Sequence, residues 1–491
     1  MRSLSFVDHI DFKDVYTNNS RNYCLYDVDN DGDNELVIGA WDSGRILENG
    51  EADAENIQGS IHILKYKRVW KAAYHLGMVL CVTAGSIYPS CQTWIIALCA
   101  DSHCYAFDAS TSVYDYSEIT SVKSGSKLQH HNSHHHQQHQ RGSSKMGQKI
   151  KIDPLKMVHH QELAYNAKDV CILNQGEIAV AHSDRVVRLY SWCSFETQKS
   201  SSSSLLTTSS SDSPSNLGEF ILLIKWELAG QVNRIDTCWT PKHGLILIAS
   251  QPSGGFAHLH RKFERYHKNV APTLTYYPPR VTSNSNLETR TWLVGNVNYS
   301  KCHEFKSVPP PYDTVSTTIV DNISSYLICL STADGNIFLV DPTHENDTDL
   351  VMWSIQVHTR SELFGLCKMK LTKDDGDQIV VCSWDGATYI FDVNNNSVCF
   401  PLGQSCQAFI AGLYAIEPGQ NLPVLIYSTF DRNTLIYYNL QLDHIAAQSL
   451  HSTILKDHIL VEKLQSRNID PHNPLQLSEA IRYILYELPK Q

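Results

Sequence analysis

A strand–turn–strand pattern that recurs along the chain constrains its fold more than any other feature. Short apolar runs rich in β-branched and aromatic residues alternate with polar turns that contain Asp, Ser or Gly. These turn residues supply the positive φ angles that β-hairpins need. The seven copies are Glu35–Gly39, Trp94–Asp108, Glu177–Tyr190, Leu245–Leu259, Tyr326–Asp341, Ile379–Asp392 and Val424–Tyr438.

Seven copies without long helices between them predict an all-β protein, a β-propeller of about seven four-stranded blades. A single four-stranded sheet cannot cover both of its apolar faces. A radial arrangement buries each face against the next sheet and leaves only short edges. We expect the N-terminal strand Leu4–Ile10 to pair with the last blade and close the ring. Two or more separate β-sandwiches are the alternative, although they would not explain the recurrence.

Four polar segments interrupt the pattern. They lack periodic apolar residues, which predicts disordered inserts between strands. The segments are 42–58, 110–154, 198–218 and 262–288. The second contains the histidine-rich run Gln129–Gln140 and the third contains a serine run. Imidazoles bind transition metals, but a disordered polar insert also accounts for the histidine run.

The chain divides by pattern into residues 1–441, expected to form the propeller, and residues 442–491, expected to form a short helical tail. Apolar residues keep near-helical spacing from Leu450 to Leu464 and again from Leu477 to Leu488, with two prolines between these stretches. Such spacing is typical of amphipathic helices that pack on a neighbouring surface. The sequence does not decide whether that surface is the propeller or a partner.

Charge and composition exclude several classes of protein. The net charge is −11, and the one basic cluster, Arg261–Lys268, is short, so we expect no nucleic-acid partner. No signal peptide, lipidation motif or run long enough to span a bilayer is present, and Trp94–Ala100 is more typical of one buried strand. Several of the 14 cysteines lie in apolar runs, as free thiols do in intracellular proteins.

The strongest local motif is an acidic loop that runs into the first copy. Carboxylates alternate at Asp27, Asp29, Asp31, Asp33 and Glu35, and a glycine within the loop permits a tight turn. Alternate carboxylates on a tight turn converge their oxygens on a hard cation such as calcium. The pattern is that of the loop in integrin-type FG-GAP blades, although no second complete copy exists. The loop is therefore either a structural calcium site or a metal-free, hydrogen-bonded turn.

Catalytic motifs are missing from the sequence. It contains no nucleophile elbow, P-loop, dinucleotide-binding glycine pattern or zinc-protease helix motif. We therefore expect no catalytic residues and no enzyme, and no cofactor other than the structural calcium. A catalytic constellation assembled across blades would leave no such motif, because triads are recognised by geometry.

An ordered series of short motifs resembles the integrin alpha FG-GAP repeat-containing protein 2 family. The resemblance extends from the N-terminus to about Gln441, outside the inserts, and fades in the tail. The motifs are Met1–Val7, Asp27–Gly39, Ser183–Arg188, Leu228–Val232, Ser250–Pro252, Leu293–Asn296, Trp384–Ile390 and Ala411–Ala415.

The resemblance implies an FG-GAP-type propeller that serves as a non-catalytic scaffold subunit of the KICSTOR complex. Its implied partners are a kaptin-like propeller and a very large scaffold subunit, and the GATOR complex indirectly. The implied location is cytoplasmic, at the periphery of the lysosomal membrane through partners and without insertion. There the assembly would recruit GATOR and restrain mTOR complex 1 when nutrients are limiting. The alternative function is an extracellular, calcium-dependent FG-GAP adhesion or lectin-like protein.

Overall fold

The computed structural model describes most of the chain between residues 2 and 440 and part of the tail. The described residues are 2–3, 8–13, 15–42, 58–87, 93–110, 152–173, 176–195, 218–240, 244–260, 274–278, 289–299, 325–342, 350–357, 361–371, 376–392, 397–440, 454, 458–467, 469–471, 473, 476–477, 479–480 and 482. The chain forms two compact units, one of residues 3–440 and one of residues 441–491.

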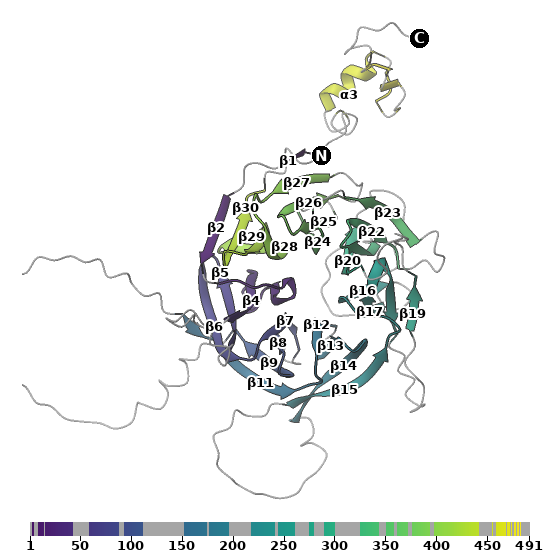
Figure 1. Ribbon diagram of the computed structural model, residues 1–491. Coiled ribbons are helices and arrows are strands. Elements are labelled where there is room, and N and C mark those ends of the chain that lie inside the picture. The colour runs from purple at the N-terminus through teal and green to yellow at the C-terminus, as the bar shows by residue number, and fades with distance from the viewer. Residues whose placement is uncertain are drawn as a thin grey trace, which may run out of the picture. The chain divides into compact units, whose positions relative to one another are not determined.

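The first unit is a propeller of seven antiparallel sheets, which confirms the predicted fold class (Figure 1). From the innermost strand outward, the first blade contains β3 (Tyr23–Tyr26), β4 (Glu35–Asp42), β5 (Gln58–Lys65) and β6 (Arg68–Leu76), and the second contains β7 (Val79–Ser86), β8 (Thr93–Cys99), β9 (His103–Asp108) and β11 (Lys156–Glu162). The third contains β12 (Ala167–Ile172), β13 (Glu177–His182), β14 (Val186–Ser194) and β15 (Gly218–Glu227). The fourth contains β16 (Ile235–Thr240), β17 (Gly244–Ser250), β18 (Phe256–Leu259) and β19 (Leu274–Tyr277). The fifth blade contains β20 (Thr291–Tyr299), β21 (Ser325–Thr332), β22 (Asn336–Val340) and β23 (Val351–Gln356). The sixth contains β24 (Leu363–Met369), β25 (Gln378–Ser383), β26 (Ala387–Phe391) and β27 (Ser397–Pro401). The seventh contains β28 (Cys406–Glu417), β29 (Gln420–Thr429), β30 (Asn433–Tyr438) and β2 (Asp8–Lys13).

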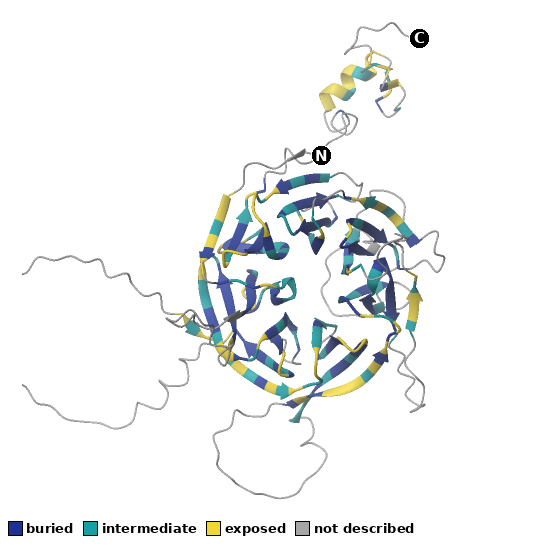
Figure 2. Ribbon diagram, in the orientation of Figure 1, coloured by how far each residue is buried: buried dark blue, intermediate teal, exposed yellow. Residues whose placement is uncertain are grey.

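Six of the seven sequence copies span the second and third strands of a blade, and the first copy, Glu35–Gly39, lies in the second strand β4. These strands are buried on both faces, so they carry the strongest apolar signal. Every residue of β8 is buried, as the run Trp94–Ala100 predicts. Neighbouring blades pack through large side chains, and the rings of Trp94 and Trp192 meet edge to face at 5.0 Å between the second and third blades. Figure 2 shows the exposed residues gathering on the outermost strands.

The ring is closed by the N-terminal strand. β2 pairs antiparallel with β30, with Asp8 opposite Tyr438 and Lys13 opposite Asn433. The prediction that the N-terminal strand pairs with the last blade is confirmed, but the strand is Asp8–Lys13 rather than Leu4–Ile10, and residues 4–7 lie outside the described residues. Phe12, which is buried in the core next to the first and last blades, fixes this register.

The insert predictions need correction at four places. β19 (Leu274–Tyr277) lies inside segment 262–288, so the loop prediction was wrong there. This strand is the outermost one of the fourth blade, and its Tyr277 ring stacks on the Phe256 ring at 4.4 Å. Asp42 and Gln58 are strand ends, Gly218 begins β15, and β10 (Asp153–Pro154) pairs in parallel with β6. Apart from Ser110, Ile152 and Pro278, the remaining insert residues, including the histidine and serine runs, lie outside the described residues.

The second unit contains the helix α3 (His458–Gln465), within the first stretch of helical spacing. Most of the stretch from Leu477 to Leu488 lies outside the described residues, although the side chain of Leu477 is buried. No helix in the described part of the chain has both the length and the apolar character to span a membrane. The remaining elements are β1 (Arg2–Ser3) and the single-turn 3-10 helices η1 (Ser20–Asn22) and η5 (Pro252–Gly254).

Candidate functional site

The acidic loop joins β3 to β4 in the first blade. Asn30 and Gly32 both adopt positive φ, 61° and 93°, which turns the chain sharply. The carboxylate of Asp27 accepts hydrogen bonds from the amides of Asp31 (3.1 Å) and Gly32 (2.8 Å). The loop is therefore held by its own backbone donors, as an Asp-rich tight turn predicts.

A lysine side chain lies at the centre of this loop. The Nζ atom of Lys65, from the end of β5, lies 2.6 Å from Oδ2 of Asp29, 2.6 Å from Oδ2 of Asp31 and 3.0 Å from Oε1 of Glu35. Its side chain is 8% exposed, and Nζ also lies 4.8 Å from the centre of the Trp70 ring. Burial alone would lower the pKa of Lys65, but the three carboxylates outweigh it and hold the pKa well above its ordinary value. Lys65 is therefore fully charged at neutral pH.

Glu35 is the most buried carboxylate of the loop, with no exposed surface. Its Oε2 accepts the amide of Val28 at 3.0 Å. Burial raises the pKa of Glu35 to about 7, although the Val28 amide and Lys65 favour its charged form. Such a carboxylate depends on a nearby positive charge to remain ionised.

The five residues predicted as calcium ligands do not all lie together. Asp27, Asp29 and Glu35 bring carboxylate oxygens within 4.8 Å of one another, which fits the reach of a hard cation. Asp31 joins them through Lys65. The Asp33 carboxylate instead accepts the amide of Gly419 at 3.0 Å and the hydroxyl of Tyr66 at 2.9 Å, on the far side of the turn.

The oxygen donors fit calcium, but the position of Lys65 does not. Its ammonium is within 3.0 Å of both Asp29 and Glu35, in the space that a cation bound by them would occupy. A divalent ion would have to displace this ammonium, because two cations at such a distance repel strongly. The structural calcium therefore stays a prediction.

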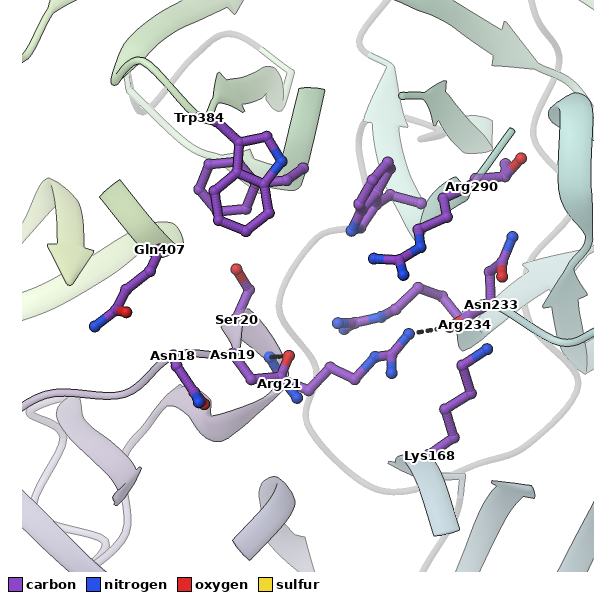
Figure 3. A pocket seen from close by; sticks show the side chains of 13 residues that line it. Asn18, Asn19, Ser20, Arg21, Lys168, Asn233, Arg234, Arg290, Trp384 and Gln407 are labelled. Atoms are coloured by element: carbon purple, nitrogen blue, oxygen red, sulfur yellow. Dashed lines mark hydrogen bonds between the residues drawn. The ribbon is translucent and has the colours of Figure 1, made fainter. Parts of the chain in front are cut away.

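A second cluster of polar residues lies at the centre of the ring. A cavity of about 370 Å³ is lined on one side by four basic residues, Arg21, Lys168, Arg234 and Arg290 (Figure 3). Arg21 precedes β3, Lys168 lies near the start of β12, and Arg234 and Arg290 directly precede β16 and β20. The entry to the innermost strand of four blades thus contributes one basic residue each.

The basic residues are fixed mainly by neutral acceptors. Arg21 donates through Nη2 to the carbonyl of Asn233, and Lys168 donates to the carbonyl of Val232 at 2.8 Å. Arg234 Nε lies 3.1 Å from Oδ2 of the buried Asp169. These contacts orient the side chains toward the cavity in Figure 3 and leave most of their charge without a counterion.

Sequence analysis missed Lys65 and the cavity residues. A lysine at the end of the otherwise buried run Ile61–Leu64 was a usable signal, since a buried lysine needs a carboxylate partner. The basic residues of the cavity are scattered over the chain, so no local cluster marks them. Their shared position ahead of an innermost strand is visible only after the blades are aligned.

Comparison with known proteins gives consistent results over the chain. The model of the integrin-alpha FG-GAP repeat-containing protein 2 family matches residues 64–442. The KICSTOR complex protein ITFG2 of Mus musculus is 25% identical over 99% of this chain and 96% of its own length. The protein of the same name from Bos taurus is 26% identical over 92% of this chain and 74% of its own length.

Among solved structures, a crystal structure of BBS1N in complex with ARL6DN, soaked with lead, matches this chain. It is 10% identical, covers 91% of this chain and 99% of its own, and gives a TM-score of 0.51. A likeness at this identity concerns the propeller fold alone.

Proposed function

Because this chain belongs to the integrin-alpha FG-GAP repeat-containing protein 2 family, we propose that it is a non-catalytic scaffold subunit of a KICSTOR-like complex. The observation that carries the proposal is the near full-length match to the KICSTOR complex protein ITFG2 of Mus musculus, 99% of this chain against 96% of that one. A match of this extent relates the two chains over their whole length rather than through one shared domain.

The fold supports this role. A propeller buries most of its strands and presents many loops, so it offers large surfaces to partner proteins. Within the complex we propose two direct partners, a kaptin-like propeller and a very large scaffold subunit. Through them the chain would help recruit GATOR to the lysosomal surface and restrain mTOR complex 1 when nutrients are limiting. Attachment to the membrane would be through partners.

We assign a structural role to the acidic loop. Its carboxylates bind Lys65, the amides of the turn and, through Asp33, the turn that contains Gly419 between β28 and β29. The loop thereby ties the first blade to the last. No step of a reaction is required to explain these contacts.

The experiment that tests the proposal is affinity purification of the tagged chain from fed and starved cells, with bound proteins identified by mass spectrometry. We expect to recover a kaptin-like propeller and a giant scaffold subunit. A clean preparation that lacks both, from cells that express them, would contradict the proposal. A parallel purification of the chain ended after Leu440 tells whether the propeller unit alone holds these partners.

A further inference from the structure

The central cavity has an excess of positive charge on one wall. Among the described residues that line it, four are basic and none is acidic. The nearest carboxylate, Asp169, is occupied by Arg234 at 3.1 Å and by the amide of Ile235 at 2.9 Å. Within the described part of the chain, Arg21, Lys168 and Arg290 have no carboxylate within 4.0 Å. Three cations thus share a partly enclosed space without a carboxylate in direct contact.

These cations act on one another. Burial, together with the charges of Arg21 and Arg290, lowers the pKa of Lys168 to about 8, although the charge of Asp169 opposes this shift. Burial also lowers the pKa of Arg21; the charge of Asp169 opposes this shift, and the charges of Arg234 and Arg290 add to it. Like charges held together in a partly desolvated site cost free energy, which an anion placed among them would offset.

An unused hydrogen-bond donor lies in the same wall. Asn233 lines the cavity, is only 9% exposed, and its side-chain Nδ2 has no partner. Its carbonyl already accepts from Arg21. A buried amide without an acceptor is costly, and a ligand oxygen in the cavity would satisfy it. This observation is independent of the charges and also indicates an oxygen-rich ligand.

The opposite wall of the cavity is aromatic. Phe364 and Trp384 line it, and their rings stack at 4.4 Å with an angle of 25° between their planes. Figure 3 shows Trp384 across the cavity from Arg21 and Lys168. An indole that lines a cavity offers a stacking partner to a planar ring, as in proteins that bind bases by stacking.

The two walls select a ligand class. A phosphate group carries up to two negative charges and several acceptor oxygens, which matches a set of forked guanidinium donors better than a single carboxylate does. We propose that this cavity binds a small phosphorylated molecule with a planar ring, of the mononucleotide class, with its phosphates among Arg21, Lys168, Arg234 and Arg290 and its ring against Trp384. This proposal does not depend on the proposed function.

Calorimetric titration of the purified full chain tests the assignment. The probes are ADP, pyrophosphate, adenosine and a phosphotyrosine peptide. We expect ADP to bind more tightly than pyrophosphate and adenosine not to bind measurably. Failure of ADP and pyrophosphate to bind at millimolar concentration would overturn the proposal. Tighter binding of the phosphotyrosine peptide than of ADP would overturn the small-molecule class.

Two variants locate the site. Arg290 is exposed, so Arg290→Gln should keep the melting temperature and weaken ADP binding at least tenfold. The matched control is Arg68→Gln, an exposed arginine on the outermost strand β6, which should leave ADP binding unchanged. Trp384→Leu should weaken ADP at least fivefold and leave pyrophosphate unchanged. Equal ADP affinity in the wild-type chain and Arg290→Gln would place the ligand elsewhere and refute the assignment.

Discussion

The ammonium of Lys65 supplies, from within the chain, the positive charge that the acidic loop needs. It contacts three carboxylates at 2.6 to 3.0 Å while only 8% of its side chain is exposed. A buried ion cluster of this kind is costly to break, because removal of one partner leaves uncompensated buried charge. The loop and β5 are therefore coupled through a single side chain.

Lys65→Met should lower the free energy of unfolding by about 3 kcal/mol, because Asp29 and Glu35 lose their counterion while the apolar stem is retained. Urea denaturation measures this loss. The matched control is Lys67→Met, which removes an exposed ion pair with Glu417 at 3.2 Å and should cost less than about 1 kcal/mol.

Calcium should affect the wild-type chain and the Lys65→Met variant differently. We expect millimolar calcium to raise the melting temperature of Lys65→Met, in which the carboxylates are free to bind it, and to leave the wild-type chain nearly unchanged. The opposite result, a strong effect on the wild-type chain that Lys65→Met abolishes, would mean that calcium binds beside Lys65 and would support the calcium site predicted from the sequence.

His62 should make the propeller sensitive to mild acid. Burial lowers its pKa to about 4, with Ser60 Oγ 3.0 Å from Nε2 and the Tyr74 ring edge-on at 5.5 Å. Between pH 4 and 6.5 the unfolded chain therefore binds a proton here that the folded chain does not, so stability falls as the pH falls.

From pH 7 to pH 5 the wild-type chain should lose about 2 kcal/mol more of its unfolding free energy than His62→Gln, as measured by urea denaturation at each pH. Equal losses in the two proteins would show that His62 is protonated without cost in the folded state.

Residue types alone predicted part of the acidic loop. Carboxylates at alternate positions of a tight turn point to the same side, so the sequence predicts that their oxygens converge. Asp27, Asp29 and Glu35 do so directly, and Asp31 joins them through its contact with Lys65. The separate position of Asp33 depends on Gly419, which is distant in the sequence. Contacts of that kind arise from ring closure, which no local pattern encodes.

Among the elements, the closing strand β2 joins the two ends of the ring. Its Phe12 is buried next to Tyr23 of the first blade and Ile436 of the last. A hydroxyl network continues the junction: Tyr23 Oη lies 2.6 Å from Ser428 Oγ, and Thr434 Oγ1 donates to the carbonyl of Val15 at 2.6 Å. The junction thus combines strand pairing, apolar packing and buried hydrogen bonds.

Phe12→Ala should lower the free energy of unfolding by about 3 kcal/mol, because it removes a large side chain from this shared core. Chemical denaturation followed by tryptophan fluorescence measures the loss. Asp11→Ala, an exposed neighbour on the same strand, should change it by less than about 0.5 kcal/mol. Comparable losses for both variants would mean that β2 contributes through its backbone alone.

The burial and the length of a strand decided whether it could be predicted from the sequence. The second and third strands of the blades are buried on both faces, and the seven sequence copies lie in these strands. In β25, for example, all six residues are buried. The innermost strand β12 has no simple alternation of burial. The outermost strand β19 is four residues long and half exposed, which left it inside a predicted loop. Elements that alternate weakly, or are short, leave no period to detect.

At the scale of the whole molecule, the division between residues 3–440 and 441–491 predicts independent stability. A chain ended after Leu440 should keep the thermal unfolding midpoint of the propeller within about 2 °C, because the core clusters lie within residues 12–436. Differential scanning calorimetry of the full and shortened chains makes this comparison. A fall of more than about 5 °C would show that the tail stabilises the ring.

The pairing of β2 with β30 also governs how the protein can be made. A ribosome that adds roughly 5 to 20 residues per second needs about 20 to 80 seconds to pass from Lys13 to Asn433. During that interval the first strand has emerged while its partner has not been synthesised. Each of the earlier blades can form its own sheet as it emerges, but β2, translated at the very start, has to wait for the last blade. Synthesis of β30, rather than formation of the earlier blades, therefore sets the earliest moment at which the ring can lock.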